Sequence, residues 1–213
     1  MGQRAGRQNQ KQRTRSAIVA TARDLVSQGK VPSVAEVAEA ALVSPATAYR
    51  YFPDQLSLLR AALQEALPRD EEIATPIHDK TADVAERVAH ATTAFLRLTL
   101  KRESLVRAVM ALSLLQSVEA PANRREAAAL RPGYRLAWIA QALAPLEGRI
   151  NAGALRRLTN ALAVVVSSEA LIALQDVSGL DAKEAVDICA WAARTLVQAT
   201  VSNHTGEADR KVD

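Results

Sequence analysis

The chain has 213 residues, of which 49% are hydrophobic and 3% aromatic, a composition typical of a helical protein with a core and unlike that of a disordered chain. No apolar run approaches the roughly 18 residues that a membrane span needs, so we expect no membrane partner. The basic N-terminus is followed by no apolar signal-peptide core, and the single cysteine, Cys189, excludes an internal disulfide, so the sequence favours a cytoplasmic protein.

Positive charge is concentrated at the N-terminus. Residues 1–60 hold nine Lys and Arg against four Asp and Glu, and the first fifteen residues contain no acidic side chain. Residues 1–13 lack apolar periodicity, so we expect 1–11 to form a disordered basic arm. Such an arm ahead of a helical unit is typical of nucleic-acid binding, although a solvated tail without function has the same composition. The basic residues among the first fifteen are Arg4, Arg7, Lys11, Arg13 and Arg15.

Short amphipathic helices are expected over residues 12–67, at about 15–28, 34–41, 45–52 and 55–67. Ser33 and Glu36 have the spacing of a capping box. Ser44-Pro45 opens the third of these helices, because a serine can cap a helix and a proline fits its first turn. Asp54 is expected to cap the fourth.

Residues 33–52 have the pattern of a helix-turn-helix, although pairs of short helices are common in helical proteins. In its second helix, Ala48 and Phe52 lie four residues apart and are expected to face the core. Small residues at the helix start would let the backbone approach base edges, and hydroxyl groups further on could reach phosphate oxygens. The residues expected on the outward face are Pro45, Ala46, Thr47, Tyr49, Arg50 and Tyr51.

The stretch SVAEVAEAALVSPATAYRYFPDQLSLL resembles the DNA-binding domain of the tetracycline-repressor (TetR) family, and the resemblance covers about residues 12–67. It implies that Ser33, Ser44 to Thr47 and Tyr49 to Tyr51 occupy base- and phosphate-contacting positions. Two residues depart from the family pattern. Leu42 stands where the family usually has glycine, and Gln55 stands where it often has a phosphate-contacting lysine.

An acidic, proline-interrupted linker is expected at 68–79, followed by a helical domain over 80–202 and a flexible tail at 203–213. The predicted fold is therefore all-α, and the resemblance implies an N-terminal three-helix DNA-binding domain and a C-terminal helical bundle for dimerisation and ligand sensing. The bundle's helices are expected at about 80–101, 104–117, 124–144 with a break near Pro132-Gly133, 151–177 and 181–202.

The resemblance implies that the last two long helices join two protomers. Their small and apolar faces permit close helix packing, although the same faces could simply complete the core of a monomer. The candidate dimerisation residues are Ala161, Val165, Trp191, Ala192 and Leu196.

Large side chains of the C-terminal half could line a cavity for a small-molecule effector, but at helical spacing such residues are more often core. Glu169 lies in an apolar stretch, where a buried carboxylate would need a partner and an exposed one would not. The candidate ligand-binding residues are Phe95, Met110, Tyr134, Trp138, Trp191 and Glu169.

The sequence therefore predicts a transcriptional regulator, more specifically a ligand-responsive repressor that binds a near-palindromic double-stranded DNA operator as a homodimer. A constitutive DNA-binding regulator with a filled bundle is one alternative, and a helical carrier or enzyme with a vestigial helix-turn-helix is another. We expect no enzymatic activity, cofactor or metal, because the sequence has no phosphate-binding loop, nucleophile motif or metal-ligand spacing.

Overall fold

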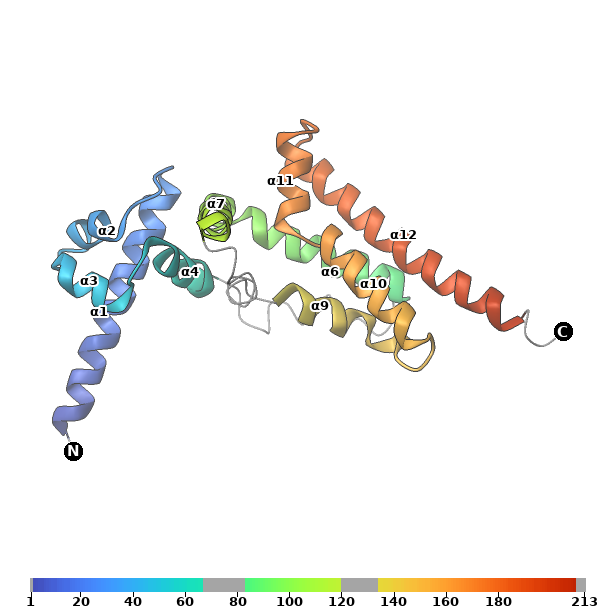
Figure 1. Cartoon of the computed structure of the whole chain (residues 1–213), viewed down its shortest axis with the longest axis horizontal. Helices are drawn as coiled ribbons and strands as arrows, with labels where there is room; N and C mark the ends of the chain where they lie inside the picture. The colour runs from blue at the N-terminus through green and yellow to red at the C-terminus, as the bar shows by residue number, and fades with distance from the viewer. Residues whose placement is uncertain (1, 67–82, 120–133, 210–213) are drawn as a thin grey trace. The chain divides into compact units, whose positions relative to one another are not determined.

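The computed structural model describes residues 2–66, 83–119 and 134–209, and every regular element in these ranges is a helix. The all-α fold expected from the sequence is therefore confirmed. The helices are Gly2–Ser27 (α1), Val34–Ala40 (α2), Pro45–Tyr51 (α3), Gln55–Ala66 (α4), Val84–Leu100 (α6), Glu103–Glu119 (α7), Tyr134–Leu143 (α9), the short 3-10 helix Ala144–Leu146 (η2), Ala152–Val165 (α10), Ser168–Asp176 (α11) and Ala182–Asp209 (α12) (Figure 1).

The helices fall into two compact units. The first unit contains α1 to α4 together with α7, and the second contains α6 and α9 to α12. The first unit has one apolar core, to which each of its five helices contributes. Its completely or almost completely buried side chains include Ile18, Val19, Val34, Val37, Leu58 and Leu59.

The helix α7 lies in the first unit, whereas the sequence predicted that residues 80–202 would form one C-terminal domain. Leu105, Ala108 and Val109 of α7 are buried in the same core as α1 and α4. Arg60 of α4 also donates a hydrogen bond from Nη2 to Ser113 Oγ of α7 at 3.3 Å. The apolar face of α7 has ordinary helical spacing, so local sequence could not indicate which unit it would join.

The helix α1 begins at Gly2, although residues 1–11 were expected to be a disordered arm. The difference has a physical reason, because the later half of α1 is fixed by the burial of Ile18, Val19, Ala22 and Val26. Once such a helix is nucleated, each added residue gains a backbone hydrogen bond without a new nucleation cost. The Ala, Arg, Gln and Lys residues of the first segment favour this extension, since all are good helix formers.

Side-chain caps define where the short helices begin. Ser33 Oγ accepts a hydrogen bond from Glu36 N at 3.2 Å, and Ser33 N donates to Glu36 Oε2 at 2.7 Å, which confirms the predicted capping box. These bonds, first of all the one from the Ser33 backbone, hold the pKa of Glu36 below its usual value. Ser44 and Asp54 cap α3 and α4 as expected, through Thr47 N and Ser57 N.

The turn between α2 and α3 is a Schellman motif with leucine at the position that usually holds glycine. Val43 N donates to Ala38 O at 2.9 Å, and Leu42 N donates to Glu39 O at 3.1 Å. Leu42 adopts φ = 55°, a left-handed conformation that L-residues rarely take, and its side chain is 92% exposed. With Leu42 in place of the family's usual glycine, the turn therefore keeps its hydrogen bonds, but the backbone at Leu42 is strained.

Replacing Leu42 with Gly is expected to raise the free energy of unfolding by about 0.5–1 kcal/mol. A left-handed L-residue costs about 1–2 kcal/mol, and the greater flexibility of glycine in the unfolded chain offsets part of the gain. Leu42→Ala is the matched control, because it keeps the strained Cβ and removes a side chain that buries little surface. Urea unfolding would measure both changes, and an equal stability change in the two variants would contradict this account.

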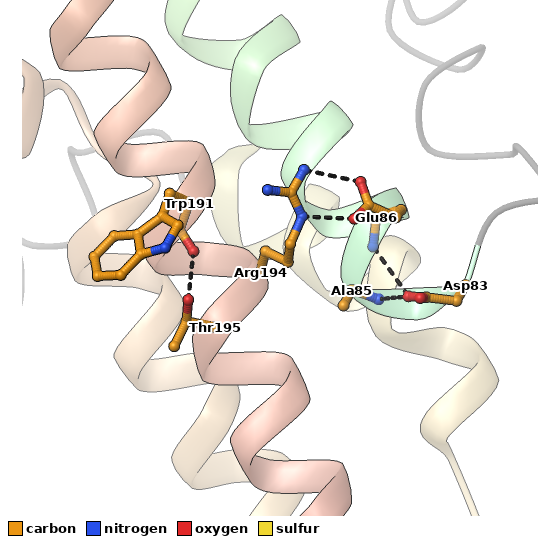
Figure 2. Close-up of polar contacts among 6 residues, drawn as sticks. All are labelled: Asp83, Ala85, Glu86, Trp191, Arg194 and Thr195. Atoms are coloured by element: carbon orange, nitrogen blue, oxygen red, sulfur yellow. Dashed lines mark hydrogen bonds and ion pairs between the residues drawn. The ribbon is translucent and has the colours of Figure 1, made fainter.

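The second unit is built around the pairing of α6 with α12, and α9, α10 and α11 pack against these two helices. Arg194 of α12 donates from Nη2 to Glu86 Oε2 of α6 at 2.9 Å, and its Nε lies 2.6 Å from Oε1 of the same carboxylate (Figure 2). The Glu86 carboxylate raises the pKa of Arg194 above its usual value. Asp83 caps the same end of α6 by accepting from Ala85 N and Glu86 N, so this end of α6 is held at several points.

The single long helix predicted over 151–177 is instead two helices, α10 and α11, which are bent by 44° at Val166 and Ser167. Ser167 Oγ accepts from Ala170 N at 2.9 Å and thereby caps α11. The preceding β-branched run lowers helix propensity, so a break costs little at this point. In the described ranges no single helix is long and apolar enough to cross a membrane, and α10 and α11 reach that length and apolarity only as a bent pair.

Candidate nucleic-acid interface

The helix α3 is fixed to the first unit by its inward face. Ala48 is fully buried and Phe52 nearly so, and both belong to the core that α1, α2, α4 and α7 share. The two residues are four positions apart and therefore on the same side of the helix. Their predicted orientation is confirmed, and it directs the opposite face of α3 to the surface.

The exposed face of α3 begins with small residues and continues with polar ones. Ser44, Pro45 and Ala46 are exposed at the helix start, and Tyr49 and Arg50 are exposed one turn later. Thr47 is half-buried, and its hydroxyl is hydrogen-bonded to Ser44 Oγ at 2.9 Å. The N-terminal turn thus combines little steric bulk with the partial positive charge of a helix start.

Tyr51 is less exposed than the sequence predicted. Its ring is half-buried and packs against the apolar core, so it supports α3 as well as lining the surface. The guanidinium carbon of Arg50 lies 5.8 Å from the centre of this ring, within the range of a cation–π contact. This contact restricts the position of the Arg50 guanidinium beside the Tyr51 ring.

Two polar contacts fix the helices that surround α3. Arg15, counted in the sequence among the arm's charges, forms an ion pair with Glu65 of α4 and lies 5.5 Å from the centre of the Phe52 ring. Gln55 donates from Nε2 to Val31 O at 3.0 Å and to Pro32 O at 2.9 Å. Gln55 stands where the family often has a lysine, and it joins α4 to the segment before α2. Ser33, at the end of this segment, is half-buried and forms the capping box with Glu36.

An open hollow of about 400 Å³ lies between the N-terminal part of α1 and α3. From α3 it is lined by Thr47, Arg50 and Tyr51, which the sequence had placed in the candidate interface. The residues from α1 are Gln10, Lys11 and Thr14. Lys11 was counted among the basic residues of the N-terminus, whereas Gln10 and Thr14 were not singled out. Their basic and polar character was visible in the sequence, but their position beside α3 depends on the helical extension of α1.

The candidate ligand-binding residues are only partly brought together. Phe95 and Trp138 meet edge to face, with ring centres 5.1 Å apart, and both pack against the core of the second unit. Met110 lies on α7 and therefore in the other unit, and the side chain of Tyr134 lies outside the described part. The core interpretation fits the described aromatic pair, and the effector cavity stays a prediction.

Glu169 is partly exposed and has an ionic partner. Its Oε2 accepts from Arg135 Nη1 at 2.8 Å, which joins α11 to α9. The sequence required a partner only for a buried carboxylate; this one is 41% exposed and is nevertheless paired with an arginine. Within the described ranges, no group of three or more His, Cys, Asp or Glu could hold a metal ion.

The candidate dimerisation residues divide into two groups. Val165 and Leu196 are half-buried and pack against the core of their own unit, as the monomeric-core alternative required, and Ala161 and Ala192 are also half-buried. Trp191 differs, because 62% of its side chain is exposed. Figure 2 shows its indole pointing away from the ion pair of Arg194 and Glu86, while its carbonyl accepts a hydrogen bond from Thr195 Oγ1 at 2.9 Å.

The exposed apolar surface of α12 also includes a residue that the sequence analysis missed. Ile188 is 41% exposed and lies three positions before Trp191, on the same side of the helix. The three-residue spacing of Ile188 and Trp191 is visible in the sequence. The sequence alone, however, does not show which face of α12 is buried and which is exposed.

No family model matches the chain, and no curated protein matches it. A solved structure does match, that of a TetR-family transcriptional regulator from Streptomyces coelicolor, with a TM-score of 0.64 and 21% sequence identity. The match covers 93% of this chain and 86% of that one. The chain therefore has the fold of that regulator, and the resemblance drawn from the sequence is confirmed at the level of the fold.

Proposed function

We propose that the protein is a DNA-binding transcriptional regulator that reads an operator with α3. The observation that carries the proposal is the exposed face of α3, which is small at its N-terminal end and polar beyond it, on a helix whose other face is locked into the core. A backbone that can approach base edges, followed by hydroxyl and guanidinium donors, suits major-groove reading with phosphate contacts alongside. The fold shared with a TetR-family transcriptional regulator supports the proposal.

The regulator is proposed to act as a homodimer on a near-palindromic operator. One helix as short as Pro45–Tyr51 offers few base contacts, so specific binding benefits from a second copy. Two copies of α3 would then enter successive major grooves about 34–36 Å apart. The exposed Trp191 and Ile188 on α12 support this assembly, because an exposed tryptophan beside another apolar side chain is typical of a protein interface.

Repression relieved by a small molecule is the regulatory mode that we propose. A ligand that binds only the conformer with the wrong spacing of the two recognition helices would release the operator. The packing of the Phe95–Trp138 pair against the core of the second unit favours the alternative of a constitutive regulator. A reporter placed behind the operator, with and without a library of small molecules, separates the two, because only a responsive repressor loses repression when its effector is added.

Selection from random double-stranded oligonucleotides should enrich a near-palindrome with two half-sites. A Tyr49→Ala, Arg50→Ala double variant is the control, because both side chains are exposed and their loss should leave the fold intact. We expect the double variant to enrich no sequence while its unfolding transition stays close to that of the original protein. Failure of the original protein to enrich any sequence would refute the proposed function.

A further inference from the structure

The hollow between α1 and α3 has the composition of an anion site. Six residues line it, and they provide an ammonium group, a guanidinium group, three hydroxyl groups and one carboxamide. Both charged residues, Lys11 and Arg50, are cationic, and the lining contains no carboxylate. Each of these side-chain types carries a hydrogen-bond donor. Thr14 Oγ1 already donates to Gln10 O at 3.0 Å and the Thr47 hydroxyl is bonded to Ser44 Oγ, so the ammonium and guanidinium groups are the main donors for an anion.

The geometry of the two helices explains why these donors converge. Gln10 and Thr14 are four positions apart on α1, with Lys11 next to them, so the three share one side of the helix. On α3, Thr47 and Tyr51 have the same spacing, and Arg50 lies beside Tyr51. The cation–π contact with Tyr51 restricts the position of the Arg50 guanidinium, which reduces the entropy lost when it binds an anion.

We propose that this hollow binds one phosphodiester group of the DNA backbone, held from opposite sides by Lys11 of α1 and Arg50 of α3. The inference rests on the proposed function and adds a specific contact to it. The hollow is open rather than enclosed, so one group of a polymer backbone can enter it. A phosphate bound there would tie the N-terminal extension of α1 to the recognition helix and so fix the register of α3 in the groove.

The test is a scan of the selected operator in which one phosphate at a time is replaced by an uncharged methylphosphonate. Three single variants are compared with the original protein: Lys11→Gln, Arg50→Gln and, as the matched control, Arg13→Gln. Arg13 is exposed on the same extension of α1 and does not line the hollow. Because two residues turn a helix by about 200°, Arg13 lies on the side of α1 opposite Lys11. Each variant removes one positive charge.

We expect the original protein to lose about tenfold in affinity at one phosphate per half-site, as befits a hydrogen bond to a charged group. Lys11→Gln and Arg50→Gln should both lose this sensitivity, and at the same phosphate, whereas Arg13→Gln should keep it. If Lys11→Gln responds to every methylphosphonate as the original protein does, the proposal is refuted. If the Lys11 and Arg50 variants lose sensitivity at different phosphates, the shared site is refuted as well.

A competition arm separates backbone phosphate from free phosphate. Inorganic phosphate and chloride are added to the protein–operator complex at equal ionic strength, and we expect equal displacement. Two results together would overturn the proposal and assign the hollow to a free anion. Phosphate would displace the operator more strongly than chloride does, and Lys11→Gln would remove that difference. The methylphosphonate scan would show no dependence on position. Binding of the unmodified operator by the original protein tests the proposed function separately, since it does not depend on any single phosphate.

Discussion

Replacing Trp191 with Glu should convert the proposed dimer to monomers and weaken operator binding by about a hundredfold or more. A tryptophan anchor in an interface contributes about 2–4 kcal/mol, which corresponds to a 30- to 1,000-fold change in association. Because the indole is 62% exposed in the single chain, its replacement should leave the fold of the unit unchanged. Sedimentation at micromolar concentration would measure the association, and titration of operator DNA would measure the binding.

Leu136→Glu is the matched control for this change. Leu136 lies on α9 of the same unit and is 45% exposed, so the same charge is placed on an exposed apolar position of another helix. It should leave both the association and the operator affinity unchanged. Leu196→Glu would be a poor test, because Leu196 packs against the core of its own unit and a buried charge would unfold it. A Trp191→Glu protein that remains dimeric would show that α12 does not join the protomers through this face.

Local features of the fold could be predicted because their cause lies within one helical turn. The capping pair Ser33 and Glu36 forms as expected. Asp181 and Glu184 have the same spacing at the start of α12, and there Glu184 N donates to Asp181 Oδ1 at 2.8 Å. The inward orientation of Ala48 also follows from periodicity alone. In each case residues three or four positions apart determine the outcome, so no tertiary information is needed.

The wrong predictions concern long-range packing or competing local preferences. Apolar residues recur along 151–177 on both sides of Ser167. The break there depends on a serine that can either continue a helix or cap a new one. The membership of α7 in the first unit and the hollow beside α3 arise from residues far apart in the chain. Periodicity gives the buried face of a helix but does not identify the partner that buries it.

Replacing Ala46 with Leu is expected to change which operators are bound. Ala46 is exposed in the first turn of α3, where, in the proposed binding mode, its small side chain would let the helix approach the base edges. A leucine should cost about 1–3 kcal/mol on the original operator, or roughly ten- to a hundredfold in affinity. Selection with the variant should enrich sites that differ at one position in each half-site, while the unfolding transition stays the same because the residue is not part of the core.

Tyr51→Phe provides the contrast that separates reading of bases from contact with the backbone. Phenylalanine keeps the half-buried ring and its contact with Arg50, so the change removes only the hydroxyl group. One lost hydrogen bond to phosphate should weaken all operators alike, by about 0.5–1.5 kcal/mol. Ala111→Leu, at an exposed position on α7, controls for the added bulk and should change neither affinity nor preference. If Tyr51→Phe altered the preferred sequence and Ala46→Leu did not, the hydroxyl side of α3 rather than its small N-terminal turn would face the bases, and the proposed orientation of the recognition helix would be wrong.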